Sequence, residues 1–188
     1  MKCALPGFDI EKDPIAAKQR IAYVPDDPKL FDTLTVWEHL DFVAAAYQVP
    51  NFTGHAEQLL QRFELESKRN TIARELSRGM RQKVAIACAY LRNPAVILFD
   101  EPMTGLDPHG IRTLKQSIQE QAARGAAVLV SSHLLSLMEG LCTHLVILHQ
   151  GACLFRGSVD EAAIRFPGLG GDQSLEEIFF EATRPATP

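Results

Sequence analysis

The sequence predicts an α/β fold with a mostly parallel sheet and an inserted all-helical subdomain. Apolar runs at 95–100 and 126–132 read as strands, and the segment between them, 108–124, has the apolar spacing of a helix, which is the order of a parallel unit. Residues 35–92, in contrast, contain only helical patterns. A chain of 188 residues with 46% hydrophobic content can bury a full core. We expect helices on both faces of the sheet, as in most parallel sheets.

The elements of the first half follow from turn and capping residues. Ile21–Val24 is a short strand, stopped by the turn signal Pro25-Asp26-Asp27-Pro28. Thr35 and Glu38 form a capping box for a helix over 36–47, which Pro50-Asn51 ends. Two further helices are expected, one from about Thr53 and one capped by Ser77 that runs to about Leu91.

In the second half, Asp107 and Pro108 start the helix that Gly125 ends. Residues 144–149 and 152–156 read as a hairpin that closes the sheet. The remaining segments are a short helix at 159–166, a connection at 167–171, and a last helix capped at Ser174 that runs through Ala182.

Composition excludes several classes of protein. The net charge of −4 with interspersed signs gives no basic stripe, so nucleic acid is not an expected partner. No apolar run has the length of a membrane span, and the first residues are too short and too broken for a signal peptide, so we expect a cytosolic chain. The four cysteines have no C-x-x-C spacing, which argues against a zinc site or a disulfide framework.

The most informative segment is the apolar strand Val96–Phe99 followed by Asp100, Glu101 and Pro102. Adjacent carboxylates at the end of a buried strand can hold magnesium and polarise water beside a phosphate. On its own the segment could equally end a core strand with solvated acids. Its neighbours make it specific: Leu76-Ser77-Arg78-Gly79-Met80-Arg81-Gln82 precedes it, and Thr104-Gly105-Leu106-Asp107 and a strand ending at His133 follow it.

In this order the segments resemble the ATP-binding cassette (ABC) ATPases, from about Gly7 to Glu181. The resemblance implies a P-loop NTPase-like core and a head-to-tail dimer in which two subunits sandwich two ATP molecules. It implies ATP and Mg²⁺ as cofactors, a second ABC ATPase subunit and a transmembrane permease subunit as partners, and a place on the inner face of the cell membrane through that permease.

The resemblance also assigns roles at the carboxyl ends of the strands. Asp100 would hold the magnesium shell, and Glu101 would be the general base for the attacking water. His133 would be the switch histidine that reaches the terminal phosphate, although a lone histidine there is more often structural. Asp26 stands where the family usually has a glutamine that touches magnesium. Asp107 matches the aspartate that crosses to the other subunit, although capping of the helix that begins at Pro108 explains it just as well, and we expect it to do both.

The segment from Leu76 to Gln82, which matches the family's signature motif and is called the signature segment below, would face the nucleotide of the partner subunit. Ser77 and Gly79 match the family pattern, in which a helix start presents N–H groups and a hydroxyl to phosphate oxygens. Arg78 replaces the usual glycine and Met80 the usual glutamine. For Ser77 alone, an ordinary helix cap is the simpler interpretation.

Phe31, Trp37 and Tyr47 lie in the part of the family fold that docks the coupling helix of a membrane subunit. An alternative, more probable for Tyr47 than for Trp37, is that they belong to the core of the helical subdomain.

The chain contains no Gly-Lys pair, so it has no G-x-x-x-x-G-K-[ST] phosphate loop. We therefore expect an ABC ATPase chain truncated at its N-terminus, with an exposed apolar sheet edge. The expected divisions are 1–34 for a remnant of the core, 35–92 for the helical subdomain that ends in the signature motif, 93–166 for the core with the Asp-Glu strand and switch histidine, and 167–188 for a linker and helix.

The first hypothesis is the ATP-hydrolysing subunit of an ABC transporter. The alternative is a non-hydrolysing module that lends only its signature half-site to a complete partner. A superfamily member in repair or translation is less consistent with so short a chain, and a dinucleotide-dependent dehydrogenase is disfavoured because no G-x-G-x-x-G follows a strand.

Overall fold

A three-stranded parallel sheet is the centre of the fold in the computed structural model, which describes residues 4–5, 8–9, 11–167 and 174–184. Its order is β3-β4-β5, with β3 at Ile21–Val24, β4 at Val96–Asp100 and β5 at Ala127–Ser131. The prediction of a parallel sheet is therefore confirmed. Parallel pairing places the carboxyl ends of all three strands at one edge of the sheet.

The two faces of this sheet differ in burial. On one face Ala22 and Ile97 are 1% and 0% exposed, whereas on the other Tyr23 and Leu129 are 59% and 62% exposed. These four residues occupy paired positions, since Ala22 pairs with Ile97, and Tyr23 and Leu129 both pair with Leu98. Within the described part of the first unit, helices cover only the Ala22–Ile97 face, so the helices expected over the other face are not found there.

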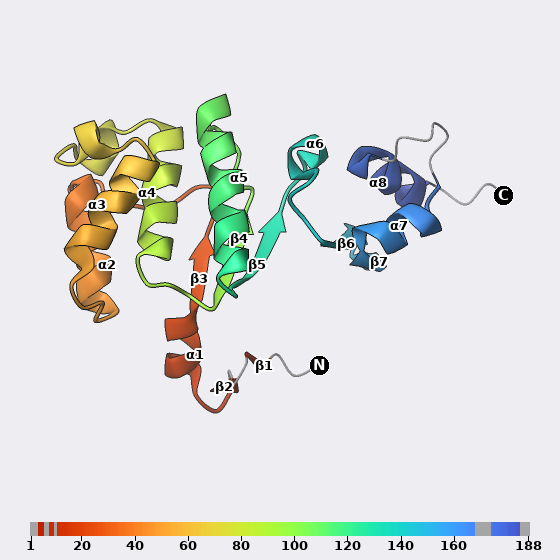
Figure 1. The fold of residues 1–188 in the computed structure, drawn as a ribbon, viewed down its shortest axis with the longest axis horizontal. Coiled ribbons are helices and arrows are strands. Elements are labelled where there is room, and N and C mark those ends of the chain that lie inside the picture. Colours follow the sequence, from red (N-terminus) through yellow and green to blue (C-terminus); the bar gives the residue numbers. More distant parts are fainter. Residues whose placement is uncertain (1–3, 6–7, 10, 168–173, 185–188) are drawn as a thin grey trace. The chain divides into compact units, whose positions relative to one another are not determined.

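The chain divides into two compact units, residues 1–131 and 132–188. In the first unit, α4 packs against β3 and against the helical pair α2 and α3, and α5 packs against β5 (Figure 1). The bounds of the remaining elements of this unit are β1 Ala4–Leu5, β2 Phe8–Asp9, α1 Pro14–Arg20, α2 Val36–Ala46, α3 Phe52–Arg62, α4 Arg78–Tyr90 and α5 Pro108–Ala123, with short 3₁₀ turns at Glu66–Lys68 and Ala73–Glu75.

Helix α1 was not expected, although its start has a clear signal. Pro14 is at its first turn, and the Asp13 side chain accepts a hydrogen bond from the Ala16 N–H at 3.3 Å. Proline and aspartate at these positions are favourable for a helix N-terminus. Of the predicted family-like stretch 7–10, Gly7 and Ile10 lie outside the described residues.

Tyr90 joins the helical region to the sheet. Its ring lies 6.1 Å from that of Phe63 and 6.3 Å from that of Phe99 on β4, between ring centroids. Its hydroxyl lies 2.9 Å from Ser117 Oγ on α5, and the Ser117 hydroxyl donates to the Leu114 carbonyl at 2.7 Å. Tyr90 is 1% exposed, so this polar chain satisfies a buried hydroxyl within an aromatic cluster.

The second unit contains α6 Leu135–Met138, β6 His144–His149, β7 Ala152–Ser158, α7 Val159–Arg165 and α8 Leu175–Thr183. The hairpin is confirmed, and β6 and β7 form a two-stranded antiparallel sheet. That the hairpin closes the parallel sheet stays a prediction. The predicted cap at Ser174 is present for α8, and Ser158, for which no cap was predicted, caps α7. Most of the predicted connection at 167–171 lies outside the described residues. The fourfold division of the chain into domains stays a prediction.

Candidate functional site

Asp100 is held at the end of β4 by hydroxyl groups from both neighbouring strands. The Ser131 hydroxyl donates to Asp100 Oδ1 at 2.6 Å, and the Tyr23 hydroxyl donates to Asp100 Oδ2 at 3.3 Å. Ser131 is the paired residue of Asp100 across the β4–β5 ladder. A carboxylate offers about four lone-pair sites, so these two bonds orient Asp100 and leave acceptor capacity.

Tyr23 stays a donor at neutral pH. Partial desolvation, followed by the negative charge of Asp100 and the hydrogen bond to it, raises the pKa of the Tyr23 phenol above 10.0. The phenol therefore keeps its proton well above neutrality, and its interaction with Asp100 does not change over the physiological range.

Glu101 has the left-handed backbone conformation, with φ of 46°. Its N–H donates to the Ser131 carbonyl at 3.1 Å and to Ser131 Oγ at 3.3 Å, which fixes the turn that ends β4. A non-glycine residue in this region costs roughly 1–3 kcal/mol. The sequence predicts the acidic pair at this place, but not this backbone conformation.

The signature segment forms the N-terminus of α4. The Ser77 side chain accepts from the Met80 N–H at 3.3 Å, so its interpretation as a helix cap is correct. Gly79 lies against the loop before α5, because a Cβ built on Gly79 would be 2.6 Å from the Gly105 carbonyl oxygen. Only glycine fits this approach without movement of the backbone.

Arg78 contacts Asp26, and these are two of the positions at which the sequence departs from the family pattern. The Arg78 guanidinium donates to Asp26 Oδ1 at 2.7 Å, and both side chains are about half exposed. The structure thus brings the loop after β3 to the start of α4, which the sequence did not predict.

Asp107 caps α5, as the simpler interpretation of the sequence required. Its Oδ1 accepts from the Gly110 N–H at 2.6 Å. This bond, and after it the positive charge of Lys83 and of His109, lowers the pKa of the Asp107 carboxyl below its ordinary range. A role for Asp107 in crossing to a second subunit stays a prediction.

His133 follows β5 directly but belongs to the second compact unit. The structure places it after Ser132, whose hydroxyl oxygen accepts from the Leu134 N–H at 3.1 Å. Its predicted role as the switch histidine that reaches the terminal phosphate stays a prediction.

Within the described residues, no group of three or more His, Cys, Asp or Glu side chains could hold a metal ion. This does not conflict with the chemistry of Mg²⁺, which proteins often bind through one or two carboxylates together with substrate phosphates and water. A role of Asp100 in holding Mg²⁺ stays a prediction. One oxygen of Asp26 is already bonded to Arg78.

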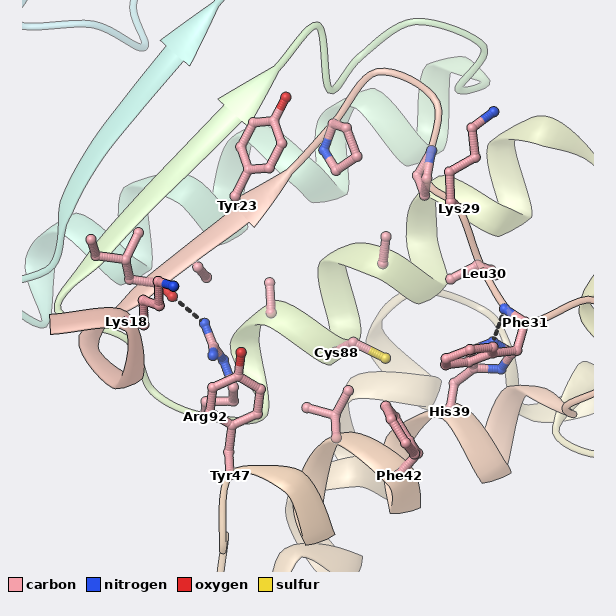
Figure 2. Close-up of a pocket in the computed structure, with 17 residues that line it drawn as sticks. Lys18, Tyr23, Lys29, Leu30, Phe31, His39, Phe42, Tyr47, Cys88 and Arg92 are labelled. Carbon is pink, nitrogen blue, oxygen red and sulfur yellow. Dashed lines mark hydrogen bonds between the residues drawn. The ribbon is translucent and has the colours of Figure 1, made fainter. Parts of the chain in front are cut away.

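A second feature of the first unit is an apolar groove of about 620 Å³ between β3, the loop after it, α2 and α4. Figure 2 shows Phe31, Phe42 and Tyr47 around it. Their exposed fractions are 54%, 51% and 41%, and the Phe31 and Phe42 rings meet edge to face at 5.2 Å. Of the three aromatic residues predicted to dock a partner, Phe31 and Tyr47 line this groove. Trp37 does not, because its ring packs under Arg69 and beside Phe52.

The walls of the groove are fixed by polar contacts. His39, 4% exposed, accepts from the Phe31 N–H through Nε2 at 3.0 Å, so its Nδ1 carries the proton and donates to the Thr35 carbonyl at 2.7 Å. Arg92 donates to the Ile21 carbonyl and lies over the Tyr47 ring at 3.8 Å (Figure 2). The aromatic side chains are therefore exposed on a supported scaffold.

Comparison with known proteins identifies the family. Residues 5–104, more than half of the chain, match the ABC transporter family. The chain belongs to the ABC transporter ATP-binding proteins. It is 36% identical to the ABC-type transporter ATP-binding protein EcsA of Bacillus subtilis over 96% of the chain and 73% of that protein. It is 34% identical to the ABC transporter ATP-binding protein NatA of the same organism, over 82% of the chain and 64% of that protein.

A solved structure described as the ATP binding subunit of an ABC transporter matches with a TM-score of 0.89 and 37% identity, over 96% of this chain and 75% of that one. ABC ATP-binding proteins are generally ATPases, dimerise and act with transmembrane permease subunits. The predicted family, the predicted α/β fold class and the predicted function as an ATP-binding subunit of an ABC transporter are confirmed. In the part of the chain that the structure describes, no helix is long and apolar enough to cross a membrane.

Sequence reasoning missed two residues of this ABC ATP-binding chain, Tyr23 and Ser131. Both were placed in strands, yet neither was assigned to the site. The signal was available, because parallel strands that end together bring their last polar side chains to one edge. What was missing was the register that pairs Ser131 with Asp100.

Proposed function

We propose that this chain takes part in ATP hydrolysis through Asp100 and Glu101 and drives transport through a permease bound in the apolar groove. The observation that carries the proposal is the pair of hydroxyl donors, Tyr23 and Ser131, that fix the Asp100 carboxylate beside Glu101. Hydroxyl donors on both oxygens hold a carboxylate in one orientation, which is what a catalytic metal site needs from its surroundings.

Asp100 is the residue that would hold Mg²⁺. Its remaining lone pairs suit an oxygen-seeking cation or the water bound to it. Mg²⁺ neutralises charge on the ATP phosphates when it is bound. Asp26 would contact the same magnesium shell through water, since its bond to Arg78 uses only one of about four lone-pair sites.

Glu101 would act as the general base. It follows Asp100 directly, and its left-handed backbone turns the chain out of the sheet at the carboxyl edge. A carboxylate there accepts a proton from the attacking water. His133, which follows the adjacent strand β5, would hold the geometry of the terminal phosphate.

The start of α4 would serve the nucleotide of a second ABC ATPase subunit. Ser77, Gly79 and Met80 lie at the N-terminus of α4, where negative charge is stabilised, although the Met80 N–H already donates to Ser77 Oγ. Asp107 lies two residues after Gly105, whose carbonyl oxygen approaches Gly79, and would cross to that subunit. No Gly-Lys pair occurs among the 188 residues, so the proposal assigns no phosphate loop to them.

The test of the reactive carboxylate uses the protein purified from its native source with its associated subunits. Glu101→Gln keeps the shape and removes the base, so ATP turnover should fall by about 10²–10⁴-fold while the Kd for ATP stays within about twofold. Glu66→Gln, on the exposed 3₁₀ turn, is the matched control and should change neither. Unchanged turnover in Glu101→Gln would refute the role of Glu101.

The same turnover assay distinguishes the proposed function from the alternative, a module that lends only its signature half-site to a complete partner. That alternative is favoured by the combination of a well-formed cap at Ser77 and no Gly-Lys pair. It predicts that Ser77→Ala impairs hydrolysis by the complex, whereas Glu101→Gln does not.

The groove would bind the coupling helix of the permease and thereby hold the chain at the inner face of the cell membrane. Phe31 and Phe42 are exposed aromatic side chains on a supported wall, the type of residue that carries most binding energy at interfaces. Phe31→Ala with Phe42→Ala should weaken co-purification with membrane subunits by at least about tenfold. The control is Phe180→Ala, which is 69% exposed and does not line the groove. Equal retention by both variants would refute the docking site.

A further inference from the structure

Arg78 contacts two other segments of the first unit as well as starting α4. Its guanidinium reaches Asp26 in the loop after β3 at 2.7 Å. Its aliphatic stem lies over Gly105 in the loop before α5, because a Cβ built on Gly105 would be 3.3 Å from Arg78 Cδ. One side chain therefore touches loops that are 52 residues before it and 27 residues after it in the sequence.

The contact with the loop before α5 is close for a backbone reason. Gly105 has φ of 78°, a conformation that favours glycine, and its carbonyl oxygen approaches Gly79. The first turn of α4 and this loop are thus in direct backbone contact, and the Arg78 stem covers the junction.

The loop after β3 is held differently. Its residues Asp26 and Asp27 lie between two prolines, and Asp27 pairs locally with Lys29. Arg81 reaches the Pro28 carbonyl at 3.5 Å, a longer contact than the 2.7 Å bond of Arg78 to Asp26. The Arg78–Asp26 pair is the shorter connection between this loop and α4.

We propose that Arg78 is a positioning residue for ATP hydrolysis, which couples the loop carrying Asp26 to the signature segment and to the loop before α5 within one subunit. This inference rests on the proposed function, because it assumes that these three segments surround nucleotide. The Arg78 and Asp26 side chains are 52% and 43% exposed, so solvent screens the pair and the link is reversible. A reversible link adjusts the relative position of the loops without adding much to the stability of the fold.

The first test needs no ATP and uses the full chain in solution. Arg78→Met keeps the stem over Gly105 and removes the charge, so the backbone NMR order parameters of Asp26 and Asp27 should fall from about 0.85 toward about 0.6. Arg78→Lys should restore part of the order, since it keeps the charge. Arg112→Met, which removes an exposed charge from α5, is the control and should leave both values unchanged. Unchanged order in Arg78→Met would overturn the inference.

The second test uses the protein with its associated subunits. Arg78→Met and Asp26→Asn should each lower kcat by about two- to fivefold, the fold-change expected from an exposed charge pair, with the KM for ATP within about twofold. The double variant should be no slower than the slower single variant, because both break one link. Asp27→Asn, whose side chain faces Lys29, should leave kcat unchanged. A double-variant loss equal to the product of the single losses would show that the two residues act separately, and would overturn the inference.

The two tests keep this inference distinct from the proposed function. If Glu101→Gln fails to lower turnover while Arg78→Met still loosens Asp26, the link exists but the catalytic assignment is wrong. If Glu101→Gln abolishes turnover and Arg78→Met changes neither loop order nor kcat, the catalytic assignment stands and the link is refuted.

Discussion

Substitution of Gly79 by alanine tests the contact between α4 and the loop before α5. A Cβ at this position would lie 2.6 Å from the Gly105 carbonyl oxygen, closer than Cβ atoms approach other atoms, so one backbone must shift. Overpacking of this kind costs roughly 1–3 kcal/mol. Alanine also favours the helix over glycine by about 0.5–1 kcal/mol, which offsets part of the cost.

Gly54 provides the matched control. It lies in helix α3, and a Cβ built there meets nothing within 4 Å. Gly54→Ala therefore gains the same helix preference without a clash and should stabilise the chain by about 0.5–1 kcal/mol. The difference between the two variants isolates the clash, at roughly 1–3 kcal/mol, or a Tm difference of about 2–12 °C at 2–4 °C per kcal/mol for a chain of this size.

The assay is urea unfolding followed by the fluorescence of Trp37, the one tryptophan of the chain. Trp37 reports on the first unit, because its ring is covered by Arg69 at 3.4 Å and lies 5.8 Å from the Phe52 ring. Gly79→Ala should unfold at lower urea than wild type, and Gly54→Ala at higher urea, with the same slope. If Gly79→Ala is as stable as Gly54→Ala, the close approach of α4 to the loop before α5 is incorrect.

Two further substitutions test polar contacts of the first unit. Tyr90→Phe loses the hydrogen bond to Ser117 and should lower the free energy of unfolding by about 0.5–1.5 kcal/mol in a urea titration. Burial raises the pKa of Tyr90 from 10.0 to about 12, so the wild type should lose stability as the pH rises from 10 to 12, and Tyr90→Phe should lack this component. Asp107→Ala removes the cap that accepts from Gly110 and should cost about 0.5–2 kcal/mol. Because the pKa of Asp107 is lowered, its contribution is present above pH 3.8 and is lost as the pH falls through the folded value, and Asp107→Asn should keep the cap but show a smaller acid loss.

Much of the fold was predictable because local signals agree with it. The strand at Ile21–Val24, the helix after Thr35 and the helix after Ser77 all begin or end at residues with a clear physical preference. The face of the sheet that helices cover was not predictable from the sequence. Tyr23 and Leu129 are apolar enough for a buried face, yet they are exposed, because a hydrophobic pattern indicates what a chain can bury and not what covers it.

Some residues of the candidate site could also be predicted from the sequence, and others could not. Asp100 and Glu101 could be predicted, because an acidic pair directly after an apolar strand is visible in the sequence. The donor from Ser131 depends on the register of β4 and β5, and a slip of one residue would turn the Ser131 side chain to the other face. The contact between Arg78 and Asp26 joins residues far apart in the chain, and no periodicity or turn signal carries that information.

The loop after β3 contributes both to the apolar groove and to the contact with the start of α4. Pro25, Pro28 and Lys29 line the apolar groove, whereas Asp26 of the same loop is bonded to Arg78 at the start of α4. Proline fixes its own φ and restricts the residue before it, so this short segment has few internal degrees of freedom. If a partner helix binds in the groove as proposed, it contacts the same short segment that is bonded to Arg78. Loss of the Arg78 charge should then uncouple the groove from the proposed nucleotide site, while both can still be occupied.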